Sequence, residues 1–428
     1  MVVELARSGT PRRARTESAD QVASREGGPV EGTRHREGRP DIAWGDVDDN
    51  FVTEFSKRML TSLPRRDQRE RGEWYISGLL SIPGRKSMRS IASVIGGGAA
   101  EQRLHHFISK SSWDWLAVRR ALAGHLDRTL LPHAWVVRPM YVVKTGEHTV
   151  GVEESFVPQL GRVVNSQKSY GVWLANEEQS APINWRLILP TDWLQDKERR
   201  RRAEIPDGEG EADPGAVALH TVLEPLRAWG LRCRPVVMDA RDHDAAVLAR
   251  NFARKGVPFV LRIGGTTLLV PNDTLSTGHA ERRLQAQQLI EWVKKASRQV
   301  GWVDPNSSIN RSALVTGTRV SLPAPGGGLP LQLAGAWSGW ERQPGELWLT
   351  NLTDAPPAVL LRLGRLTERV EHDFAEISTR VGVRDFEGRT FGGWHRHVTL
   401  SSVAHAIVTL SAARHQEERS ARSLIRSA

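Results

Sequence analysis

The sequence predicts a mixed α/β fold, and two patterns within its 428 residues indicate it. Between residues 134 and 190, four segments rich in β-branched and aromatic residues follow one another, as in a meander of antiparallel strands. Residues 216–264 then alternate between amphipathic helical segments and short apolar runs, the last of which are "CRPVVMDA" and "PFVLRIG". A meander that leads into alternating helices and strands predicts one sheet with both antiparallel and parallel strands.

The same patterns divide the chain into segments. Residues 1–45 contain few apolar positions and are expected to form a disordered basic and polar arm. Residues 46–131 are expected to form a helical domain of the DNA-binding type, because Phe51, Phe55 and Met59 recur at helical spacing and basic clusters follow. The α/β domain is expected to begin with residues 132–265, to be interrupted by a β-rich insertion at 266–352, and to end with helices at 353–415 and a tail at 416–428.

Charge and cysteine content narrow the function classes. The formal net charge of +10 favours a polyanionic partner such as nucleic acid, although a solvated basic surface is the alternative. A single cysteine, Cys233, excludes an internal disulfide framework and a Cys-rich zinc site. The start lacks the apolar core of a signal peptide, and no apolar run is long enough to span a membrane. We therefore expect a cytoplasmic protein with no membrane partner.

Two acidic residues are the main candidates for chemistry. Asp239 ends the apolar strand in "VVMDARDHD", at the edge of the sheet where ligand sites of α/β proteins collect. The alternative is that Asp239 is a turn or capping residue, as we expect for Asp242 or Asp244 at the start of the next helix. Glu371 lies on an amphipathic helix in "RVEHDFAEI", and on this pattern alone it could equally be a solvated surface residue.

A third stretch, "FEGRTFGGWHRHVTL", also carries groups that could take part in chemistry. It contains Glu387, and its His395 and His397 form a His-x-His pair that could bind a metal if they lay on a strand. No third ligand lies nearby in the sequence, so a metal site here is the weaker interpretation.

The order of these elements resembles bacterial insertion-sequence transposases of the DDE superfamily, which have an RNase H-like endonuclease domain. The resemblance extends from about Phe51 to about Leu410. It rests on seven blocks in order: "RDQRERGEWYISGLLS", "QRLHHFISKSSWDW", "KTGEHTVGVEESFVPQLGRVVNSQ", "NWRLILPTDWLQDKERRRRAEIP", "VVMDARDHD", "RVEHDFAEI" and "FEGRTFGGWHRHVTL". It implies an RNase H-like mixed sheet with flanking helices, into which some members insert β-rich residues.

The resemblance also implies a chemistry. In such enzymes two Asp and one Glu hold two Mg²⁺ or Mn²⁺ ions, which activate a water or a DNA 3′-hydroxyl for attack on a phosphodiester. Asp239 matches the second Asp and Glu371 matches the helical Glu, so both are implied as catalytic and metal-binding residues, with Glu387 as the alternative to Glu371. Double-stranded DNA is the implied partner, the nucleoid is the implied location, and a homodimer is expected by analogy.

The chain departs from the family pattern at the position of the first Asp. Residues 135–152 read as a hairpin of a strand, a turn and a second strand, and the acidic residue should follow the first strand. Lys144 and Gly146 match the pattern, but residues 138–140 are Arg, Pro and Met, and Ser378 stands where a Lys often follows the helical Glu. An Arg at this place disfavours divalent cations. A neighbouring acid could substitute: Glu147 lies nearby, and either Glu153 or Glu154 is expected to point inward from the adjacent strand.

Two functions therefore remain open from the sequence. The first is a pseudoenzyme of transposase descent that binds DNA and is catalytically impaired, acting as a regulator or persisting as a remnant. The second is an active transposase that uses a substitute carboxylate to cleave and join insertion-sequence ends. Both predict DNA contact through the helical domain and the cationic residues 197–202.

Overall fold

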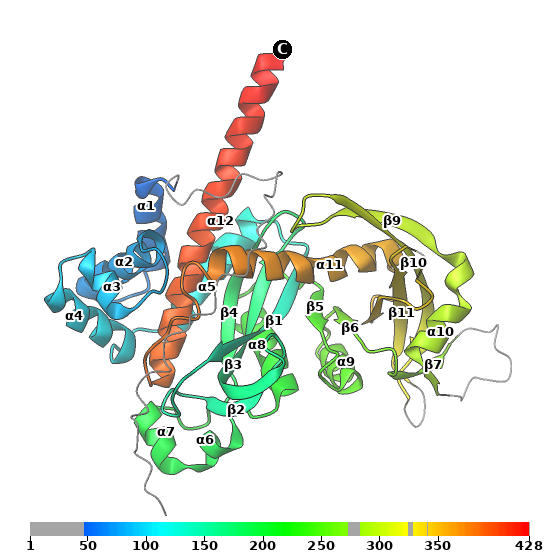
Figure 1. Cartoon of the computed structure of the whole chain (residues 1–428), viewed down its shortest axis with the longest axis horizontal. Helices are drawn as coiled ribbons and strands as arrows, with labels where there is room; N and C mark the ends of the chain where they lie inside the picture. Colours follow the sequence, from blue (N-terminus) through cyan, green and yellow to red (C-terminus); the bar gives the residue numbers. More distant parts are fainter. Residues whose placement is uncertain (1–46, 273–282, 324–327, 340, 428) are drawn as a thin grey trace, which may run out of the picture. The chain divides into compact units, whose positions relative to one another are not determined.

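The computed structural model describes residues 47–272, 283–323, 328–339 and 341–427 (Figure 1). Contacts divide the chain into Met1–Arg39 and Pro40–Ala428, and all of the described residues belong to the second unit. The arm expected at residues 1–45 lies outside the described residues.

The first described elements are five helices, whose buried apolar side chains belong to the same apolar cluster as those of the sheet. Phe55 and Met59 are buried in this cluster and Phe51 is half-buried, as their helical spacing predicts. Carboxylates cap two of the helices, because Asp48 accepts a hydrogen bond from the backbone N–H of Asn50 and Asp114 accepts one from that of Leu116. The helices are α1 (Asp49–Met59), α2 (Arg66–Ser81), α3 (Met88–Ser93), α4 (Gly98–Ser109) and α5 (Trp115–Thr129).

Twelve strands in the described residues form one mixed sheet, in the order β2-β3-β1-β5-β6-β12-β11-β10-β7-β8, with β4 beside β3 and β9 beside β10. Strands β1, β5 and β6 are parallel to one another and the other pairs are antiparallel. The predicted α/β fold of the RNase H-like type is thus confirmed. The strands are β1 (Ala134–Val143), β2 (Val152–Val157), β3 (Arg162–Ala175), β4 (Ser180–Leu187), β5 (Val236–Asp239), β6 (Phe259–Arg262), β7 (Leu268–Pro271), β8 (Leu284–Gln285), β9 (Arg298–Val303), β10 (Asn310–Ser321), β11 (Pro330–Trp337) and β12 (Glu346–Thr350).

The hairpin expected at residues 135–152 does not form, because its two strands, β1 and β2, do not pair with each other. Strand β1 pairs along its whole length with β3, from Ala134 opposite Ala175 to Val143 opposite Ser166, and its other edge pairs with β5. With both edges of β1 occupied, β2 pairs with the outer end of β3 instead. Strand β2 is therefore separated from β1 by β3.

The strand-rich residues after β6 extend the same sheet. Strand β12 pairs antiparallel with β6, with Leu349 opposite Leu261, and β11 and β10 continue outward from it. The β-rich residues therefore extend the sheet sideways beyond β6.

Helices cover the sheet and connect it to the first five helices. Helix α11 contacts β1, β5, β6, β12, β11 and β10, and Figure 1 shows it lying across these strands. It continues into a single π-helical turn, η3 (Phe374–Ser378). Helix α12 packs against β4 and against α2, α4 and α5. The helices that follow α5 are, with α11 and α12 included, α6 (Thr191–Gln195), α7 (Lys197–Ala203), α8 (Pro214–Ala228), α9 (Ala245–Arg254), α10 (Ala286–Trp292), η2 (Lys294–Ala296), α11 (Pro357–Asp373) and α12 (Phe391–Ser427).

Within the described residues, we find no helix with the length and apolar character needed to cross a bilayer.

Two buried histidines hold α12 in place. Nε2 of His397 donates to the carbonyl oxygen of Gly382 at 2.9 Å, and its Nδ1 accepts from the Tyr75 hydroxyl at 2.8 Å. His405 likewise donates to the carbonyl of Ser180 and accepts from the Ser378 hydroxyl, both at 2.9 Å. Burial lowers the pKa of each imidazole to about 4, so both are neutral at pH 7.

These histidines predict a loss of stability in mild acid. The unfolded chain binds protons at its histidines below about pH 6.5, whereas the folded chain does so only near pH 4. Stability is therefore complete above about pH 6.5 and falls as the pH drops toward 4, by up to about 3 kcal/mol for each histidine. Urea unfolding at a series of pH values checks this. His405→Gln removes one titrating group, so its unfolding free energy should depend less steeply on pH than that of the wild type; an equal slope contradicts the assignment.

Candidate functional site

The ends of β5 and β6 bring three charged residues into one row. The parallel register of β1 and β5 pairs Val137 with Met238, which makes Arg138 and Asp239 the next positions on the two strands. Asp239 is in turn in register with Arg262 on β6. Residues in register on neighbouring strands lie on the same face, with the strands about 4.8 Å apart. A cation, a carboxylate and a second cation thus follow one another across the sheet.

Arg138 is held by Glu371 of α11. Its Nε and one terminal nitrogen donate to the two carboxylate oxygens at 2.7 and 2.8 Å, and its other terminal nitrogen donates to the carbonyl of Pro139 at 2.8 Å. The guanidinium carbon lies 3.5 Å from the centre of the Phe374 ring. Only 8% of the Arg138 side chain is exposed, against 63% for Glu371. A buried cation is therefore paired at the rim of the sheet with a solvent-facing carboxylate.

The Asp239 carboxylate is also hydrogen-bonded to a guanidinium, that of Arg241. Nε of Arg241 donates to both of its oxygens at 2.9 and 3.1 Å, and a terminal nitrogen of Arg241 donates to Oδ2 at 2.6 Å. Arg262 lies 3.9 Å from the same oxygen. Burial tends to raise the pKa of the Asp239 carboxyl, but the hydrogen bonds and charges of the two arginines outweigh burial and bring its pKa below the usual value. Asp239 is therefore an anion whose charge is already balanced.

The row continues into a larger ion-pair network. Glu346 of β12 lies 3.7 Å from Arg262 and accepts a hydrogen bond from Arg365 of α11 at 2.9 Å. Arg365 also pairs with Glu368 one turn along the helix. This network joins β5, β6 and β12 to α11, so the helix is anchored to the sheet on both sides of the row.

The other candidate acids have other partners or lie in other parts of the fold. Glu387 pairs with Arg85 of the loop after α2, at 2.9 Å, and not with Arg138. Glu153 and Glu154 lie on β2, where Glu153 is 3.2 Å from Lys168. The expectation that one of them points inward from a strand adjacent to β1 is wrong, because β3 lies between the two strands. Glu147 lies exposed in the turn after β1.

The His-x-His pair is not a metal site on a strand. His395 and His397 lie on α12, and both are buried. Nδ1 of His395 accepts a hydrogen bond from Arg119 at 3.1 Å, and both ring nitrogens of His397 are engaged as described above. More generally, within the described ranges no three His, Cys, Asp or Glu side chains are grouped so that they could bind a metal.

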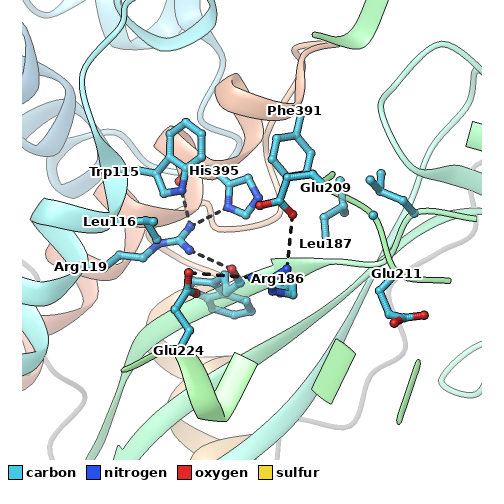
Figure 2. A pocket seen from close by; sticks show the side chains of 13 residues that line it. Trp115, Leu116, Arg119, Arg186, Leu187, Glu209, Glu211, Glu224, Phe391 and His395 are labelled. Atoms are coloured by element: carbon cyan, nitrogen blue, oxygen red, sulfur yellow. Dashed lines mark hydrogen bonds and ion pairs between the residues drawn. The ribbon is translucent and has the colours of Figure 1, made fainter. Parts of the chain in front are cut away.

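A small cavity lies away from the row, between α5, β4 and α12 (Figure 2). Its volume of about 40 Å³ has room for about three water molecules. The buried Arg119 beside it donates to Thr399, Asn184 and the carbonyl of Trp185, and also to Nδ1 and the carbonyl of His395, at 2.8–3.2 Å. All five N–H groups of Arg119 thus have partners, which makes this arginine a structural link between α5, β4 and α12.

Sequence comparison agrees with the arrangement of the sheet. The family model described as DDE superfamily endonuclease matches residues 58–318, more than half of the chain. The chain belongs to this family. None of the curated proteins compared with it gives a match. The matched residues include Arg138 and Asp239 and end before Glu371, so the family match itself covers two of the three positions.

DDE superfamily endonucleases generally use divalent metal ions, and the residues at this row do not fit such ions. Divalent cations of the Mg²⁺ type need several free oxygen ligands. Here Glu371 and Asp239 are each bound by a guanidinium through two oxygens, and the third position is Arg138. The donor set is therefore two occupied carboxylates and a cation.

Some residues of the site carried a sequence signal and others did not. Arg241 follows Asp239 by two positions in "DARDHD", where a short turn can bring the two side chains together. Arg262 on β6 and Arg384 in the loop between η3 and α12 gave no such signal, because no local pattern places Arg262 beside Asp239 or Arg384 beside Phe374. The sequence marks Phe374 only as an apolar position on the helix that carries Glu371, yet the guanidiniums of Arg138 and Arg384 both contact its ring.

We expect a Glu→Gln substitution to lower the free energy of unfolding more in the Arg138–Glu371 pair than in the Arg85–Glu387 pair. Glu371→Gln leaves the buried Arg138 guanidinium without a charged acceptor, and we expect the free energy of unfolding to fall by about 2 kcal/mol. Glu387→Gln breaks an exposed pair with Arg85 and should cost less than about 1 kcal/mol. Chemical denaturation of the two variants tests this; similar losses would show that Arg138 does not depend on Glu371.

Proposed function

We propose that this DDE superfamily protein binds double-stranded DNA and has lost most or all of its endonuclease activity. The observation that carries the proposal is the pairing of Arg138 with Glu371 at the position where the family pattern requires a carboxylate. An active transposase would need a substitute acid, and Glu153 and Glu154 are separated from β1 by β3.

Loss of cleavage follows from what a guanidinium cannot do. A divalent ion promotes phosphodiester hydrolysis by lowering the pKa of a bound water and by stabilising the leaving oxygen. A guanidinium carries a single charge, has no open coordination position and cannot be deprotonated near neutral pH. Arg138 also places a positive charge beside Asp239, which opposes the binding of a divalent cation there. The site therefore retains part of the charge pattern of the family without the means of activating water.

DNA binding is supported by the distribution of cations. The chain has a net charge of +10, and on α7 the side chains of Lys197, Arg201 and Arg202 are exposed. The neighbouring Arg200 instead donates to the carbonyls of Pro206 and Glu209 at 2.6 and 3.1 Å, so it holds the following loop. The cationic run thus combines a structural residue with exposed charges that suit the phosphates of a duplex.

The proposal predicts DNA binding without cleavage. The full chain should bind duplex DNA, with an affinity that falls steeply as salt rises from about 50 to about 200 mM. Incubation with supercoiled plasmid and with duplexes carrying candidate insertion-sequence ends, in Mg²⁺ or Mn²⁺, should give no nicked product. Metal-dependent nicking by the wild type that disappears in Asp239→Asn would contradict the proposal, because it would show a working active site.

Reversal of the substitution on β1 gives a second test. Arg138→Asp frees Glu371 and adds a carboxylate next to Asp239, so Mn²⁺ should raise the thermal midpoint of this variant by several degrees and leave that of the wild type unchanged. Arg319→Asp makes the same change of charge at an exposed position on β10 and serves as the control. If Mn²⁺ stabilises neither variant, Arg138 is not the obstacle to metal binding.

A further inference from the structure

We propose that the row formed by Arg138, Asp239 and Arg262 is a metal-independent binding site for a phosphate of the DNA backbone, with Arg384 as the principal donor. The inference rests on the proposed function, because it assumes that the chain binds DNA. To the proposed function it adds the group of the DNA that is bound, a backbone phosphate, and the residue that contacts this group, Arg384.

Positive charge is in surplus around the Phe374 ring. Two guanidiniums lie against this ring, that of Arg138 at 3.5 Å and that of Arg384 at 4.8 Å from its centre. Glu371 is the carboxylate that both of them face, and its two oxygens are taken by Arg138. One positive charge therefore remains at this end of the sheet, carried by Arg384.

Arg384 has hydrogen-bond donors that no described residue uses. Its side chain makes no hydrogen bond or ion pair with any described residue, and its buried Nε has no acceptor. A guanidinium presents five donors in a plane, and phosphate oxygens match that geometry. Burial lowers the pKa of Arg384, the neighbouring Arg138 lowers it further, and Glu371 opposes both. An anion next to Arg384 would relieve both the missing hydrogen bonds and the repulsion from Arg138.

The outer side of the row is accessible to solvent. Arg384 is half-buried in the loop between η3 and α12, whereas the Glu371 side chain is 63% exposed and that of Arg241 is 51% exposed. The outer side of the row is therefore open to a macromolecular ligand such as a DNA duplex. Arg241 and Arg262 add positive charge around Asp239, so the carboxylates at the row do not present a net repulsion to phosphate.

The site should work without metal, because guanidiniums supply the positive charge that divalent ions supply in a DDE active site. Both carboxylates are hydrogen-bonded to arginines, so a divalent ion would have to displace these bonds before it could bind. Removal of metal should leave DNA affinity unchanged.

The test measures binding of the full chain to a fluorescein-labelled DNA duplex by anisotropy, at several salt concentrations, with EDTA or with Mg²⁺. Arg384→Gln should weaken binding by about three- to tenfold and lower the slope of log affinity against log salt by about one, as expected for one lost phosphate contact. Arg384→Lys keeps the charge, so its slope should match the wild type while its affinity is lower. Arg319→Gln, which removes an exposed arginine of β10, should change neither quantity.

The outcomes separate the two proposals. If the wild type binds the duplex and Arg384→Gln binds with the wild-type affinity and slope, the phosphate site is wrong and the proposed DNA binding stands. If EDTA abolishes binding by the wild type, the metal-independent site is also wrong. If the wild type does not bind DNA at any salt concentration, both proposals fail. Thermal unfolding of each variant shows whether a loss of affinity comes from a loss of folded protein. If Arg384→Gln is less stable than the wild type, Arg384→Lys is the deciding variant, because the phosphate site requires it to keep the wild-type salt slope with a lower affinity.

Discussion

The salt bridge between Arg138 and Glu371 is the contact on which the rest of this site depends. It joins the central strand β1 to the end of α11 by two charge-assisted hydrogen bonds, with the Phe374 ring packed against the guanidinium. A buried guanidinium is costly unless its charge and donors are matched, and Glu371 and the Pro139 carbonyl match them. Because both oxygens of Glu371 are bound to Arg138, Arg384 has no hydrogen-bond acceptor among the described residues, and one positive charge is left in surplus beside the row.

The same interaction reverses the electrostatics of a DDE site. Three carboxylates that converge on one point repel one another, and bound cations relieve that repulsion. In this chain each carboxylate of the row is matched by an arginine within the fold, so no external cation is needed for stability. In the proposed function, charge that would attract a divalent ion is neutralised, and Arg384 attracts anions instead. Arg138 on β1 would thereby change which class of ligand this end of the sheet holds.

The helical part and the sheet behave as one packed body because α12 joins them. Its buried His397 bonds to Tyr75 of α2, while His405 bonds to the start of β4. Arg119 of α5 adds five hydrogen bonds to β4 and α12. These contacts fix polar groups in an apolar setting, where an unpaired donor or acceptor is expensive. The orientation of the helices relative to the sheet is therefore set by a few polar links as well as by apolar packing.

Local patterns in the sequence determined the element types, the strand that ends in Asp239 and the helix that carries Glu371, because each depends on residues close together in the chain. The resemblance to DDE transposases added the expectation of an acid where Arg138 stands. Only the tertiary structure decided that β3 and not β2 pairs with β1, since a strand's partner depends on which distant edges remain free. It also decided that Arg241 occupies Asp239 and that Arg384 reaches Phe374. Side-chain partners of this kind depend on how turns and loops return to the sheet, and that path is a property of the whole packed chain.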